Sequence, residues 1–190
     1  MARRSLKSAA YQVWVRVVAT IGLAAAILTT WWMKVEDARA PKAPSAVAFG
    51  QPVKVGRSIF TPQKLILDSG DGQGDRRLIL TGLLENATRS SQQAFFGFPD
   101  QPVVLTSGGA TFEAPRVNLG RDGRLLVQLE PRIREAVDIV WKVPPGWQEQ
   151  DVTISFSAQR FKLKDNLYAK SSWLGFYPTG TLTVRPEQGT

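Results

Sequence analysis

The hydrophobic pattern divides the chain into two parts with different periods. Residues 17–33 form an apolar run without a charge, and Val13, Trp14 and Val15 extend it backward past Arg16. A helix needs about 20 apolar residues to cross the apolar core of a bilayer. From about residue 49 the apolar runs are short and alternate with polar positions, which is typical of strands with one buried face. The pattern predicts one transmembrane helix followed by a mainly β domain.

The second part is predicted to be an antiparallel β-sandwich. Gly, Pro, Asn and Asp interrupt it about every ten residues, which is the spacing of turns in sandwiches and barrels. One-sided alternation is clearest at Leu125, Val127 and Leu129, and in residues 139–143 and 152–158. Strands are predicted over residues 53–55, 59–67, 77–85, 103–105, 111–117, 124–129, 136–143, 152–160 and 180–184.

Charged and aromatic residues orient the predicted helix. Basic residues precede the apolar run, whereas Glu36 and Asp37 follow it, so the positive-inside rule places the N-terminus in the cytoplasm. The long side chain of Arg16 can reach the membrane surface from inside the helix. Two tryptophans close the run where an aromatic belt is expected. The predicted anchor residues are Arg3, Arg4, Lys7, Arg16, Trp31 and Trp32.

The predicted organisation has five parts. It consists of a basic cytoplasmic segment (1–12), a transmembrane signal anchor (13–33), a linker (34–48), an extracytoplasmic sandwich (49–186) and a short tail (187–190). The linker mixes charge, Ala and Pro without periodicity, which indicates a spacer between the membrane and the domain.

Three alternatives to an uncleaved anchor stay open. Ala38-Arg39-Ala40 fits the small-residue motif of a cleaved signal peptide, although Pro41 follows the cut and disfavours cleavage. A twin-arginine export signal is matched in part by Arg3-Arg4, with Leu6 at the position of the expected Phe. A buried core helix is the third alternative, but adjacent tryptophans and flanking charges suit it poorly.

Composition removes several classes of function. The chain has no Cys and no His, which excludes disulfides, Cys- and His-ligated metals, and catalytic triads. Its net charge is +8, but four of the 24 basic residues and none of the 16 acids precede Lys34. The remainder is only about +4 by this count, so the high pI does not indicate nucleic-acid binding.

A family resemblance rests on three elements in order. Leu78–Asn86 is an apolar strand ending in Asn, Leu129-Glu130-Pro131 ends another strand, and Val140–Pro144 reads VWKVP. Residues 50–185 therefore resemble the immunoglobulin-like domains of unknown function that bacteria tether to their membranes. The resemblance implies an immunoglobulin-like antiparallel β-sandwich in which the Asn closes a strand against a turn. It also implies a bacterial inner-membrane location, a periplasmic domain and a binding or accessory role, with no catalytic residues.

A Gly-rich loop carries the candidate for a metal site. Asp68, Asp71 and Asp75 lie on residues 68–75 and could supply oxygen ligands to Ca²⁺. The spacing does not match an EF-hand, and a solvated hairpin loop explains the same residues by turn geometry. No cofactor is expected. Asn86-Ala87-Thr88 is a formal glycosylation triplet that arises easily by chance.

Exposed aromatic and basic residues are the candidates for partner binding. The first group is a run of phenylalanines, and the second is a row of cations that alternates with apolar residues at the end of a strand. A tryptophan in a second aromatic cluster, residues 171–178, completes the set. Core packing or a charged sheet edge would explain the same residues. The candidates are Phe95, Phe96, Phe98, Arg160, Lys162, Lys164 and Trp173, with Arg57 or Lys170 as further members of the cationic row.

Three functions follow from these features. The favoured one is a non-catalytic, membrane-tethered interaction module with an envelope protein as its partner. The second is an envelope module that binds glycan or anionic lipid through the basic row. The third is a hydrolase that uses paired carboxylates. Its candidate acids are Glu113, Glu130, Glu135 and Asp138, none of which lies in a recognisable motif, so we expect no enzyme activity.

Overall fold

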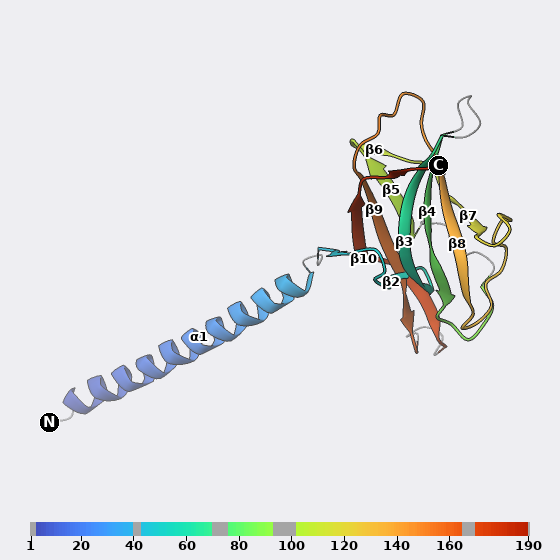
Figure 1. The fold of residues 1–190 in the computed structure, drawn as a ribbon. Coiled ribbons are helices and arrows are strands. Elements are labelled where there is room, and N and C mark those ends of the chain that lie inside the picture. Colours follow the sequence, from blue (N-terminus) through green and yellow to red (C-terminus); the bar gives the residue numbers. More distant parts are fainter. Residues whose placement is uncertain (1–2, 40–42, 70–75, 93–101, 165–169, 190) are drawn as a thin grey trace. The chain divides into compact units, whose positions relative to one another are not determined.

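The computed structural model describes residues 3–39, 43–69, 76–92, 102–164 and 170–189 (Figure 1). The chain divides into two compact units, Met1–Ala43 and Pro44–Thr190. The first unit is a single helix, α1 (Arg3–Arg39). The second is mainly β and consists of two sheets packed face to face. The predicted fold class, an antiparallel-rich β-sandwich preceded by one long apolar helix, is confirmed.

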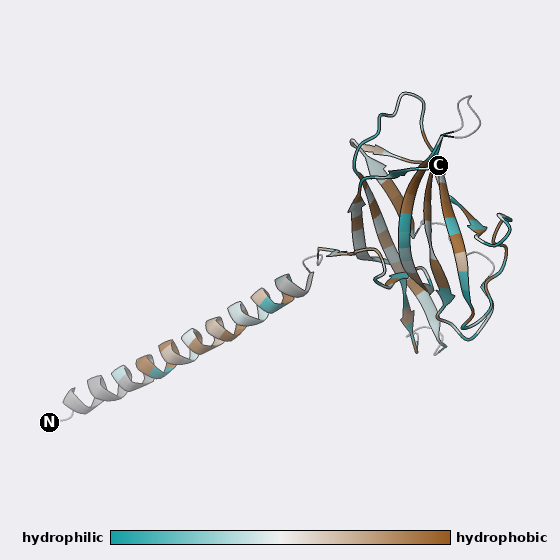
Figure 2. Ribbon diagram, viewed as in Figure 1, coloured by the Kyte–Doolittle hydropathy of each residue, from teal (hydrophilic) through white to brown (hydrophobic). Residues whose placement is uncertain are grey.

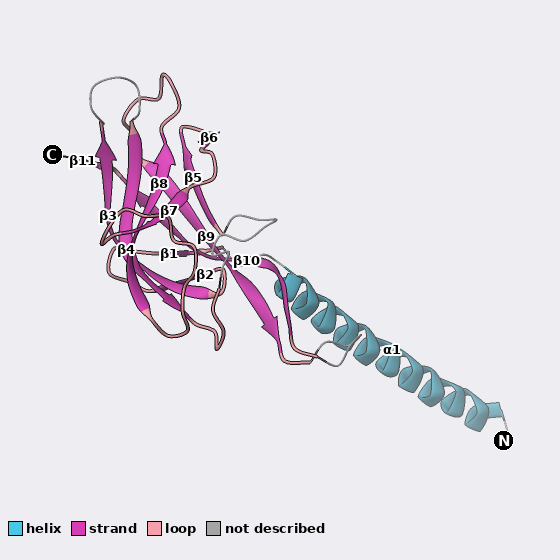
Figure 3. Ribbon diagram, turned by 90° about the vertical axis from the view of Figure 1, so that its right-hand side faces the viewer, coloured by secondary structure: helices cyan, strands magenta, loops and turns pink. Residues whose placement is uncertain are grey.

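The two sheets have the following spatial order of strands. The first sheet contains β1 (Ser45–Ala46), β10 (Ser172–Val184), β9 (Val152–Lys162), β5 (Val103–Ser107) and β6 (Ala110–Thr111). The second contains β11 (Glu187–Gln188), β3 (Ser58–Asp68), β4 (Arg77–Asn86), β8 (Arg134–Lys142) and β7 (Arg116–Leu119), while β2 (Val53–Val55) pairs with β3. Figure 3 shows the two layers from the side.

One hydrophobic core fills the space between the sheets, because alternate side chains of each strand point inward. Figure 2 shows the hydrophobic and hydrophilic bands along the strands. The predicted inward faces of residues 139–143 and 152–158 are confirmed by the burial of Ile139, Trp141 and Phe156. The Phe60 and Phe156 rings meet across the layers with centroids 6.2 Å apart. In β3 the buried side chains change from even-numbered positions, such as Phe60, to odd-numbered positions, such as Leu65. The change occurs because a register shift after Pro62 inserts one residue.

Both ends of the folded unit add a strand in parallel. Ser45 pairs with Gly180 of β10, and Glu187 pairs with Ile66 of β3. These strands lie within the segments predicted as linker and tail, and α1 continues to Arg39, beyond the predicted end of the anchor. Two-residue strands are invisible to a hydrophobic pattern, since backbone pairing rather than side-chain burial defines them.

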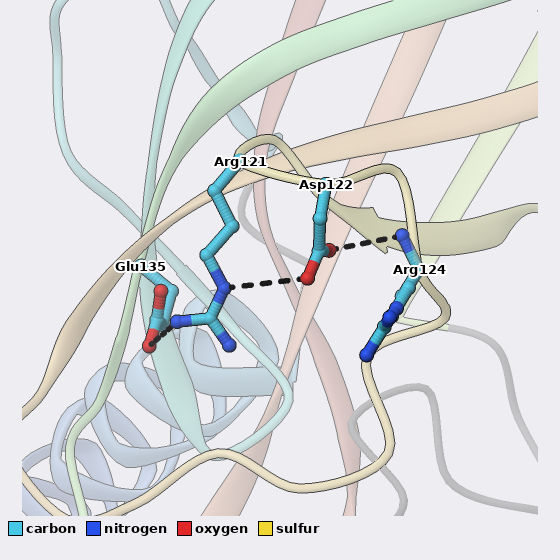
Figure 4. Close-up of polar contacts among 4 residues, drawn as sticks. All are labelled: Arg121, Asp122, Arg124 and Glu135. Atoms are coloured by element: carbon cyan, nitrogen blue, oxygen red, sulfur yellow. Dashed lines mark hydrogen bonds and ion pairs between the residues drawn. The ribbon is translucent and has the colours of Figure 1, made fainter.

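The strand predicted over residues 124–129 is wrong. Only isolated bridges occur there, and Leu125 and Val127 are 59% and 67% exposed, although Leu129 is buried. The chain makes a turn after β7, where Asp122 accepts a hydrogen bond from the Arg124 backbone N–H (Figure 4). The chain then follows the edge of the sheet, where no second layer covers the side chains of Leu125 and Val127. The strand predicted at 111–117 is divided into β6 and β7.

Candidate functional site

Helix α1 presents apolar side chains to its surroundings. Trp14–Glu36 is long and apolar enough to cross a membrane by length and composition, and none of it is buried within the chain. Leu23 and Ile27 are 64% and 60% exposed. The hydroxyl of Thr20 donates to the Arg16 carbonyl at 2.8 Å, and Thr29 and Thr30 donate to carbonyls one turn back in the same way. These bonds reduce the cost of placing threonine in lipid.

The predicted anchor residues all lie on this helix. Arg16, Trp31 and Trp32 are exposed, whereas the side chains of Arg3, Arg4 and Lys7 lie outside the described part. An apolar helix near the N-terminus fits both a membrane anchor and a signal sequence. Ala40 and Pro41, on which the choice between them rests, lie outside the described residues. Membrane retention, orientation and location therefore stay predictions.

One end of the sandwich is closed by a buried asparagine. The Asn86 side chain is fully buried at the end of β4, and its amide donates to the Ser90 and Leu129 carbonyls, each at 2.9 Å. Its carbonyl oxygen accepts bonds from the Thr88 backbone N–H at 2.9 Å and hydroxyl at 2.8 Å. Every bonding position of the side chain is thus used. The amide nitrogen is not free for glycosylation.

The β9–β10 hairpin contains most of the predicted binding residues. Beyond Gln159, whose backbone N–H donates to Gly56, β9 is paired only with β10 among the described residues. This two-stranded part extends past the rest of the sandwich (Figures 1 and 3). A two-stranded ribbon is only marginally stable by itself, so its base needs support from the body.

Arg57 and Trp173 support the base of the hairpin. The Arg57 Nε donates to Gln159 Oε1 at 2.6 Å, and its Nη1 donates to Gln92 Oε1 at 3.2 Å. The guanidinium lies 5.0 Å from the centroid of the Trp173 ring, which also contacts the Phe161 ring at 5.0 Å. Trp173 is therefore a half-buried supporting residue, and its two neighbours leave little of the ring for a sugar to stack on.

The predicted cationic row does not act as one face. The Arg160 guanidinium lies 5.7 Å from the centroid of the Tyr177 ring, so this residue also supports the base. Lys162 is half-buried at the end of β9, and Lys164 is exposed beyond it. Leu163, between these two lysines, is 82% exposed. The candidates Phe95, Phe96 and Phe98 lie outside the described residues, so their partner role stays a prediction.

The calcium candidate is described only in part. Asp68 ends β3 and forms an ion pair with Arg77 at 2.9 Å, while Asp71 and Asp75 lie outside the described residues. Within the described ranges, no group of three or more Asp or Glu side chains is placed to hold a metal ion. The ion pair already uses one Asp68 oxygen, so this carboxylate is less available as a ligand for Ca²⁺.

The candidate catalytic acids occupy separate environments. Glu130 accepts bonds from Ser91 and Gln128, and these bonds lower the pKa of its carboxyl. Glu135 pairs with Arg121, which also pairs with Asp122 (Figure 4). Among the described residues, no hydrogen bond or ion pair joins two of the four candidate acids. Glu130 and Glu135 are each bonded to different neighbours.

Asp138 gives a testable pH dependence. Burial raises the pKa of this carboxyl above its ordinary value of 3.8, so the folded state binds the proton more tightly than the unfolded state. Stability therefore falls as pH rises from about 3.8 through the raised pKa, and then becomes constant. We expect Asp138→Asn to remove this fall in urea unfolding measured from about pH 4 to pH 7. The exposed Asp151→Asn serves as the control, and an unchanged fall in the Asp138 variant would contradict the assignment.

The structure also reveals an open groove that the sequence did not indicate. It has a volume of about 470 Å³ on the outer face of β4, β8 and β7 and is lined by Arg77, Arg116, Lys142 and Glu113, among others. The register places Arg77 directly opposite Lys142. Like charges in this position weaken a sheet, and the Arg77–Asp68 ion pair relieves part of the repulsion. Only the strand register brings these cations together.

Comparisons with known proteins add little about function. No protein-family model matches the chain, and no curated protein matches it. Among solved structures it is similar to an uncharacterised β-sandwich protein from Clostridium difficile 630, with a TM-score of 0.48 and 10% sequence identity. The match covers 77% of this chain and 98% of that one. Similarity at this level carries no functional argument, so the proposals below rest on the residues of this chain.

Proposed function

We propose that the chain is a single-pass membrane protein whose β-sandwich acts outside the cytoplasm as a non-catalytic interaction module of a bacterial cell envelope. The observation that carries the proposal is helix α1, whose apolar side chains are exposed along a span long enough for a bilayer. A helix that is apolar all round requires lipid or protein to cover it. The composition supports a non-catalytic role, since the chain has no His or Cys.

The alternatives receive less support from the described residues. A hydrolase needs two carboxylates at a fixed separation, and the candidate acids make separate contacts. Glycan binding through Trp173 needs an open ring face, whereas Arg57 and Phe161 both contact this ring. The proposal therefore assigns binding to exposed surfaces of the sandwich.

Fractionation and affinity capture test the proposal together. The full chain, tagged at its C-terminus, should stay in membranes, keep its N-terminal segment by mass spectrometry, and expose the sandwich to protease only in spheroplasts. Capture from gently solubilised membranes should enrich the same envelope protein for the natural chain and for a variant in which an unrelated transmembrane helix replaces residues 13–36. Protection of the sandwich in spheroplasts, or no enrichment by either chain, would contradict it.

A further inference from the structure

The end of the β9–β10 hairpin combines exposed apolar and cationic side chains. We define the hairpin tip as Phe161, Lys162, Leu163, Lys164, Lys170 and Leu174. Its apolar members are 48%, 82% and 38% exposed, in the order Phe161, Leu163 and Leu174. Such side chains at the end of a projecting ribbon are not part of the core.

The sandwich begins beside the strand that leads to this tip. β1 pairs in parallel with β10, with Ser45 opposite Gly180 and Ala46 opposite Thr181. Parallel pairing means that the chain preceding Ser45 comes from the same direction as the residues preceding Gly180, which lead back to the hairpin tip. Pro44, which precedes Ser45, therefore lies beside the part of β10 that leads back to the tip.

The connection between α1 and the sandwich is short. Five residues separate Arg39, the end of α1, from Ser45, and this connection spans about 20 Å at most. Along β10, Leu174 and Gly180 are six residues apart, which at about 3.3 Å per residue is again about 20 Å. At full extension the connection is thus about as long as the part of β10 that leads from Gly180 back to Leu174.

The chemistry of the tip fits a lipid surface with negative charge. Residues 160–170 carry four cations and one acid. Lysine side chains beside exposed apolar residues can contact headgroup phosphates while the apolar residues enter the interface. The three exposed apolar side chains among the described residues of the tip are few for a stable protein interface, which buries about 800 Å² on each partner. Anchoring by α1 makes even weak lipid contact effective, because the local lipid concentration is high.

We propose that the hairpin tip is a second membrane-contact site, which binds anionic lipid headgroups and inserts Leu163 and Phe161 into the interface. This inference rests on the proposed membrane anchor. Arg57, Trp173, Arg160 and Tyr177 hold the base of the hairpin, so the tip meets the lipid as a supported element. Contact at two points would limit the rotation of the sandwich about the connection.

The absence of cysteine from the sequence allows a direct test. Leu163→Cys in the full chain is labelled with the fluorophore NBD, and the chain is placed in nanodiscs of phosphatidylcholine with or without phosphatidylglycerol. The matched control is Val127→Cys, an apolar position of the sandwich body that is 67% exposed. We expect a blue shift and quenching by spin-labelled lipid at 163 and not at 127, stronger with phosphatidylglycerol and weaker at high salt.

Charge reversal provides the second measurement. Lys162→Glu with Lys164→Glu should reduce the ratio of lipid-contacting to free tip, measured at 163, by about fivefold for each cation lost. Equal signals at 163 and 127, with the chain still eluting with the disc, would overturn the tip proposal and leave the anchor intact. A shift that requires added membrane protein would assign the tip to a protein partner and also overturn it. Failure of the unlabelled chain to elute with discs would overturn the anchor and this inference with it.

Discussion

Replacing Leu23 and Ile27 with Arg is expected to release the chain from the membrane. The two residues lie one helical turn apart near the centre of the apolar span, and both are exposed. Each arginine at such a position costs about 2.5–3.5 kcal/mol for insertion, so the pair costs about 6 kcal/mol. The measurement is the fraction of chain that remains in the membrane pellet after alkaline extraction.

A matched variant separates the helix from the sandwich in this experiment. Leu125→Arg with Val127→Arg introduces the same charges at exposed apolar positions of the sandwich and should leave retention unchanged. Full retention of the helix variant would show that another part of the chain holds the membrane. Release of the natural chain, with its N-terminus beginning at Pro41, would establish the cleaved signal instead.

Removing the Asn86 side chain is expected to cost about 3 kcal/mol of unfolding free energy. Asn86→Ala removes four hydrogen bonds of the side chain, each worth about 0.5–1.5 kcal/mol, although the Leu129 carbonyl keeps its bond from the Gln92 backbone N–H. The measurement is urea unfolding of the full chain in detergent, followed by tryptophan fluorescence.

Asn86→Asp tests the donor side of the same network. The carboxylate would face the Ser90 and Leu129 carbonyls, which the amide now bonds, so the loss at neutral pH should equal or exceed that of the alanine variant. Protonation of the new carboxyl restores a donor, so stability should partly recover at low pH. Thr88→Ala removes one bond of the Asn86 side chain and three bonds between the Thr88 hydroxyl and more exposed groups, and it should cost less than either. A loss below about 0.5 kcal/mol in Asn86→Ala would refute the role of this network.

The β9–β10 hairpin shows how much of a site the sequence pattern can predict. Alternation identified Arg160, Lys162 and Lys164 as a row, and the structure places the first two on β9, opposite the strand β10 that carries Trp173. The pattern could not show that Arg160 contacts Tyr177, or that Arg57 contacts Trp173 from 116 positions away in the chain. The first contact depends on the register of β9 against β10, and the second on the bridge that brings Gly56, next to Arg57, to β9.

The sequence by itself determined the apolar helix, the β class of the second unit and most of its strands. These features follow from the length and period of hydrophobic runs, which act locally and leave a direct trace in the sequence. Only the tertiary structure decided the short parallel strands at each end, the exposed course of residues 124–129 and the groove beside Arg116. Those features depend on strand register and on which layer lies opposite a residue, and neither is encoded in local periodicity.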